Sequence, residues 1–70
     1  MTCKVTTYKG EKYTFKWRKD GATKVVGSVV IFRSGCFSPD SVPKPDALNQ
    51  IGFWLKTHRG GDVIKTSKFS

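Results

Sequence analysis

The sequence predicts an α+β fold: a three-stranded antiparallel β-meander packed on one C-terminal α-helix, followed by either a short fourth strand or a tail. Three observations predict it. Aromatic residues occupy alternate positions between 12 and 18, β-branched residues are concentrated between 23 and 32, and apolar residues at helical spacing lie between Pro45 and Gly60. A chain of 70 residues is the size of one small domain, spanning residues 1–70.

The first two strands are expected at residues 3–9 and 12–19, joined by a turn at Gly10-Glu11. Successive side chains of a strand point to opposite faces. The second strand therefore has an aromatic face and a polar, basic face. The aromatic face consists of Tyr13, Phe15 and Trp17, and the basic face of Thr14, Lys16 and Arg18.

The third strand is expected at residues 23–32, after a two-residue hairpin turn at Asp20-Gly21. This register places Phe15 opposite Val26 and continues the aromatic face through Val30 and Phe32. A turn that also includes Ala22 would shift every pair by one residue. Gly27, inside this strand, indicates a bulge or a close backbone contact.

The helix is expected to begin at Pro45 and Asp46 and to end at Gly60-Gly61. Its apolar face consists of Ala47, Leu48, Ile51, Trp54 and Leu55. Residues 62–69 form either a last strand or a tail. The aromatic face of the second strand either packs under the helix or stays exposed as a platform on which unpaired bases stack.

The charge of the chain points to an anionic partner. Thirteen Lys and Arg against five Asp and Glu give a net charge of +8, which disfavours a compact fold unless something anionic binds. We expect a small non-enzymatic protein that binds DNA or RNA through a cationic face of the sheet. The candidate phosphate contacts are Lys4, Lys16, Arg18, Lys19, Lys24 and Arg59, and the candidate aromatic contacts are Trp17 and Phe53.

The same basic residues support an alternative partner, an acidic surface of another protein. The chain would then be a small interaction protein, such as an inhibitor or accessory factor carried by a phage or plasmid. Charge complementarity would speed association, and Trp54 or Phe53 would supply a hydrophobic hot spot. No apolar run approaches the length of a membrane span, so a membrane partner is not expected.

Catalytic and metal-binding patterns are weak. Each acidic residue has a turn, loop or helix-start explanation, and two cysteines with one histidine fall short of a zinc site. We expect no cofactor and no metal. A Cys36–His58 pair, or His58 with Arg59 acting on RNA, is the enzyme alternative. Without a visible signal segment, Cys3 and Cys36 are expected to be free thiols in the cytoplasm, and a disulfide between them is the alternative.

Overall fold

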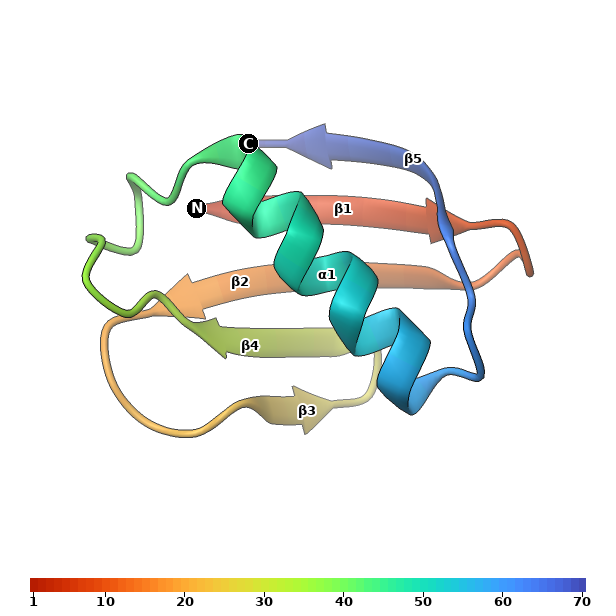
Figure 1. Cartoon of the computed structure of the whole chain (residues 1–70), viewed down its shortest axis with the longest axis horizontal. Helices are drawn as coiled ribbons and strands as arrows, with labels where there is room; N and C mark the ends of the chain where they lie inside the picture. Colours follow the sequence, from red (N-terminus) through yellow and green to blue (C-terminus); the bar gives the residue numbers. More distant parts are fainter.

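The computed structural model describes all residues, 1–70, as a five-stranded mixed sheet with one helix on it. The strand order in the sheet is β3-β4-β2-β1-β5. Figure 1 shows the helix lying diagonally across one face of the sheet. The elements are β1 (Thr2–Thr7), β2 (Lys12–Arg18), β3 (Lys24–Val26), β4 (Val29–Arg33), α1 (Lys44–His58) and β5 (Ile64–Phe69).

The first hairpin agrees with the sequence prediction. β1 and β2 pair antiparallel, with Cys3 opposite Phe15 and Val5 opposite Tyr13. The turn between them contains Gly10 at φ 84°, a conformation that favours glycine. The buried residues of both strands point towards the helix, so the aromatic side chains of β2 pack under it and are not an exposed platform.

The expected third strand is wrong in both its continuity and its pairing. A turn at Gly27 (φ 61°) divides residues 23–32 into β3 and β4, which form their own antiparallel hairpin. β4 lies between β3 and β2 and runs parallel to β2, so Phe15 is opposite Val30 and not Val26. The sheet is therefore mixed and is not a three-stranded meander.

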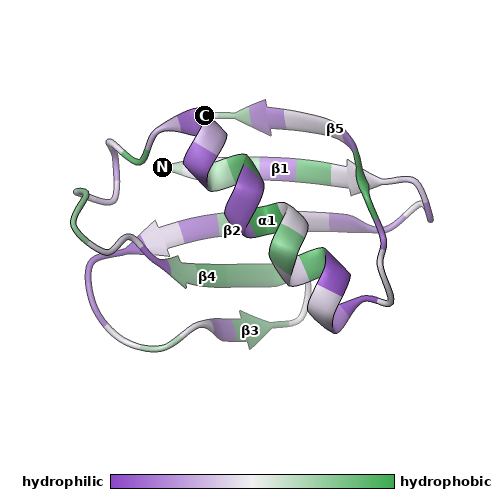
Figure 2. Cartoon of the chain, in the orientation of Figure 1, coloured by the Kyte–Doolittle hydropathy of each residue, from purple (hydrophilic) through white to green (hydrophobic).

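The Asp20-Gly21 segment is a loop that carries the chain past the position of β4 and not a tight hairpin turn. Residues 19–23 lead from β2 to β3 at the edge of the sheet, and the chain then turns back into the gap (Figure 1). β4, which is apolar except for Arg33, lies inside the sheet between β3 and β2 (Figure 2). The aromatic face continues through Val30 and Phe32, as expected.

The helix begins at Lys44 with Pro43 as its N-cap, and Pro45 and Asp46 occupy the first turn. Proline in the first turn removes an N–H that would have no partner there, and the Asp46 carboxylate complements the positive end of the helix dipole. The helix buries Ala47, Ile51, Trp54 and Leu55, as predicted, whereas Leu48 is half-buried.

Aromatic contacts join the helix to the sheet. Phe15 is fully buried, stacks on Phe32 with ring centres 5.4 Å apart, and meets Trp54 edge-on at 5.7 Å. Tyr13 also meets Trp54 edge-on at 5.5 Å. Such pairs add about 0.5–1.5 kcal/mol each beyond the area that they bury, so they fix the helix on this face.

The last segment is a strand and not a tail. β5 pairs antiparallel with β1 and forms one edge of the sheet, with a register shift beside Thr7. The loop before it is tied to the first hairpin by Asp62, whose Oδ1 accepts hydrogen bonds from the backbone N–H groups of Lys9 at 3.3 Å and Val63 at 2.9 Å. The 15-residue helix is too short and too polar to cross a bilayer.

Candidate nucleic-acid interface

The face of the sheet opposite the helix is open to solvent and is basic. Alternation along each strand and the register between strands decide which side chains share this face. Seven Lys and Arg side chains share it, and all are exposed: Lys4, Lys12, Lys16, Arg18, Lys24, Arg33 and Lys68. Between them lie threonines and a small apolar patch of Val26, Val29 and Ile31.

Like charges are direct neighbours on this open face. Lys4 of β1 is opposite Lys68 of β5, and Arg18 of β2 is aligned with Arg33 of β4. Directly opposed like charges destabilise a sheet. The arrangement therefore costs stability in the free protein, and an anion bound across the face would relieve that cost.

No carboxylate neutralises these cations. None of the five strands contains Asp or Glu, and the single salt bridge of the molecule joins the N-terminal amino group to Asp40 at 2.8 Å. The hydrogen bond from this amino group and its positive charge lower the pKa of Asp40. The seven cations of the open face thus have no salt bridge within the molecule and can meet an external anion.

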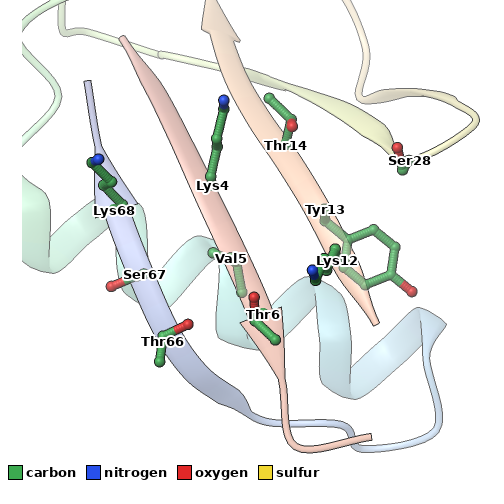
Figure 3. Close-up of a pocket in the computed structure, with 10 residues that line it drawn as sticks. All are labelled: Lys4, Val5, Thr6, Lys12, Tyr13, Thr14, Ser28, Thr66, Ser67 and Lys68. Carbon is green, nitrogen blue, oxygen red and sulfur yellow. The ribbon is translucent and has the colours of Figure 1, made fainter. Parts of the chain in front are cut away.

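A shallow hollow of about 360 Å³ lies on the open face over β5, β1 and β2. Figure 3 views it with the helix behind the sheet, and Lys4 and Lys68 project side by side from adjacent strands. The rest of the lining is mostly hydroxyl-bearing or basic: Thr6, Lys12, Thr14, Ser28, Thr66 and Ser67, with Val5 and Tyr13 beneath. Ammonium and hydroxyl groups are the donors that commonly contact phosphate oxygens.

Of the predicted phosphate contacts, the structure brings Lys4, Lys16, Arg18 and Lys24 together on the open face. The guanidinium of Arg18 folds towards the following loop and donates to the Ala22 carbonyl at 3.1 Å. Lys19 lies beyond the end of β2, at the rim, with its Nζ 3.4 Å from the Gly35 carbonyl oxygen.

Arg59 lies on the helix side of the sheet, away from the open face. Its guanidinium is 4.7 Å from the centre of the Trp54 ring, and its Nε donates to the Tyr13 hydroxyl at 3.0 Å. These contacts hold Arg59 against the end of the core, where it covers two aromatic rings. The structure therefore gives this residue a packing role and separates it from the other predicted contacts.

The two predicted aromatic contacts also lie off the open face. Trp17 is only 5% exposed, and its indole N–H donates to the Gln50 side chain at 2.9 Å, so it belongs to the core. Phe53 is 68% exposed but projects from the helix, where it lines a groove with Val25 on the opposite side of the molecule.

The sequence interpretation omitted Lys12, Arg33 and Lys68 from the site. Lys12 has the same alternation phase as Lys16 and could have been included on that signal alone. Arg33 and Lys68 reach the face only through the β2–β4 and β1–β5 pairings, which join distant segments. One sequence feature does point to all three residues: none of the segments that form strands contains Asp or Glu.

The residues considered for catalysis do not converge. Cys36 is exposed in a loop, whereas His58 stacks on Trp54 at 5.6 Å, and its Nδ1 lies 2.8 Å from the Thr57 hydroxyl. No hydrogen bond joins Cys36 to His58, and no three His, Cys, Asp or Glu side chains gather as metal ligands. Cys3 is free and buried, and burial raises the pKa of its thiol.

Comparison of the chain with protein-family models, with curated proteins and with solved structures finds no match.

Proposed function

We propose that the protein binds nucleic acid, without catalysing a reaction, through the open face of its sheet. One observation carries the proposal: seven cationic side chains share a face that no other element covers and that holds no carboxylate. Binding would release counterions from the phosphate backbone, and this release is the main driving force of charge-based nucleic-acid binding.

The free energy of this interaction should depend steeply on salt. Contacts with about five phosphates predict a log–log slope near −4.5 for a duplex, so affinity should fall roughly 500-fold between about 50 and 200 mM salt. A fluorescence-anisotropy titration with labelled DNA and RNA at several salt concentrations measures this slope. Failure to bind any of them at about 50 mM salt would contradict the proposal.

A matched pair of double variants tests whether the open face is the site. Lys4→Gln with Lys16→Gln removes two charges from this face, and Lys44→Gln with Lys56→Gln removes two from the helix. Both variants have the same net charge. The first should reduce the magnitude of the salt slope by about 1.8, the value for two lost phosphate contacts, and the second should change it little. Equal losses would show that net charge acts without a defined surface.

An acidic protein surface remains the second candidate partner, and the apolar patch of Val26, Val29 and Ile31 favours it. Protein interfaces combine an apolar centre with a polar rim, and this patch lies among the cations of the open face, with Val26 57% exposed. Trp54 is buried and Phe53 faces the other way, so neither supplies an anchor on this face.

The partner classes separate in one experiment. An acidic protein would be captured by the wild-type chain and lost with Val26→Ser, whereas phosphate contacts would tolerate that change and respond to Lys4→Gln.

Cys3 and Cys36 are both free, which fits the reducing cytoplasm where we propose that the protein acts.

A further inference from the structure

The open face carries no aromatic ring. The aromatic side chains of the β2–β4 region all point towards the helix: Tyr13, Phe15, Trp17 and Phe32. Three exposed rings lie elsewhere, Tyr8 in the β1–β2 turn, Phe37 in a loop and Phe53 on the helix. Stacking on an aromatic side chain contributes about 1–3 kcal/mol per unpaired base. A single strand lying on this face would gain none of it.

The cations form a band that crosses all five strands. Lys68 and Lys4 are opposite one another on β5 and β1, Lys16 follows on β2, and Arg33 and Lys24 continue on β4 and β3. Strands about 4.8 Å apart make the sheet roughly 19 Å wide. The band extends from one edge of the sheet to the other, with Thr14 and Ile31 between its cations.

This width prevents the face from entering a groove of DNA. The major groove is about 12 Å wide and accommodates a helix or a two-stranded ribbon, so a sheet roughly 19 Å across rests on the phosphates on either side. The residue types on the face also indicate contact with phosphates. The face has no Asn or Gln to read adenine, and its Lys and Arg could read guanine only from inside the groove, which the width of the sheet prevents.

Without stacking and base reading, affinity depends on the density of phosphate charge. A duplex carries one charge per about 1.7 Å of its axis, twice the density along either of its strands, and releases more counterions per contact than a single strand does. We propose that the ligand of the open face is a double helix, bound along its phosphates independently of base sequence. This inference rests on the proposed nucleic-acid binding.

Anisotropy titrations can test this preference with a 20-base-pair duplex DNA, its two separate strands, a duplex RNA and a second duplex DNA of unrelated sequence. For five contacts, slopes of 0.9 and 0.7 per phosphate differ by about one, which predicts roughly tenfold tighter binding to the duplex at about 0.1 M salt. The two duplex DNAs should bind within about twofold of one another, because mismatches cost affinity only where bases are read.

A Tyr8→Ala variant is the control for stacking, because Tyr8 follows β1 directly and is 70% exposed. It should leave duplex affinity unchanged. Single strands binding as tightly as the duplex would overturn the inference, and so would a tenfold difference between the two duplex sequences. Single strands could bind as tightly as the duplex while the double variant Lys4→Gln with Lys16→Gln binds them more weakly. That result would support the proposed function and contradict the duplex preference. Absence of binding to every probe would remove the proposed function itself.

Discussion

Alternate residues of β2 face two different environments. Tyr13, Phe15 and Trp17 are buried under the helix, where shape and hydrogen bonding decide what fits. Lys12, Lys16 and Arg18, on the same strand, point to an open face where charge is unopposed. The comparison teaches that the helix-covered face of the sheet holds the fold together, whereas the like charges on the open face oppose folding and would be offset by a bound anion.

The largest expected effect is on the helix-covered face. Phe15→Ala removes a fully buried ring that contacts Phe32 and Trp54, and should cost about 3–5 kcal/mol of unfolding free energy. A chain of this size has a core worth only about 3–5 kcal/mol in total, so the variant should be largely unfolded. Urea denaturation followed by circular dichroism measures the loss.

The neighbouring change Lys16→Ala is its control. Lys16 is exposed on the open face, so its truncation should alter the unfolding free energy by no more than about 0.5 kcal/mol. A large loss from Lys16→Ala would break the contrast between the two faces.

Arg59→Ala should have the next largest effect, and on stability only. The change removes the contact with the Trp54 ring and the hydrogen bond to the Tyr13 hydroxyl, which together contribute about 1–2 kcal/mol. Thermal melting measures the loss. Because Arg59 lies on the helix side, the variant's salt slope for nucleic acid should equal that of the wild type. A smaller salt slope for the Arg59→Ala variant would show that Arg59 contacts the nucleic acid.

Removing one of two opposed lysines should have a smaller effect of opposite sign. Lys68→Gln relieves the repulsion from Lys4 and should raise the unfolding free energy by about 0.2–1 kcal/mol at low salt. The same variant should bind nucleic acid more weakly. Lys56→Gln on the helix serves as the matched control, and an unchanged or lowered stability of Lys68→Gln would show that the open face is not strained by its charge.

The pH dependence of stability should be the most modest effect. Burial by itself raises the pKa of Asp62, but the Thr7 hydroxyl and the backbone N–H groups of Val63 and Lys9 outweigh it and hold this pKa below the ordinary value. A lowered native pKa stabilises the fold above the pKa of the unfolded chain. This contribution should be lost as the pH falls below about 4 and through the native pKa.

Denaturation midpoints measured between pH 7 and pH 2 would show this loss, and Asp62→Asn should make the curve flatter in that range. Asp40→Asn serves as the comparison, because the N-terminal amino group also lowers the pKa of Asp40. An Asp62→Asn curve that matches the wild-type curve would contradict the prediction.

Local patterns predicted the parts of the fold that depend on neighbouring residues. The alternation in β2 identified its buried face, and apolar spacing identified the helix and most of its buried residues. The pairing of β4 with β2 was not predictable in this way. Asp20-Gly21 and Gly27 are both competent turn positions, and the choice between them depends on β4 fitting into the sheet beside β2.

The candidate site was predictable to the same extent. Lys16 and Arg18 follow from the alternation within one strand, and Lys4 joins them through the adjacent hairpin. Arg33 and Lys68 required pairings between distant segments, which no local pattern encodes. The sequence allowed Trp17 to be either a core residue or an aromatic contact for nucleic acid. Its burial under the helix makes it a core residue.

The pairing of β5 with β1 has a consequence for how the chain folds. β1 is enclosed by β2 and β5, although residues 2–7 and 64–69 lie at opposite ends of the sequence. Nonlocal pairing of this kind is slow to form, because a long loop must close before the contacts are made. While the chain is being synthesised, one edge of β1 therefore stays unpaired until residues 64–69 appear. Lys4, in the middle of that edge, would meanwhile discourage it from pairing with other unfinished chains, as charged residues do on exposed edge strands.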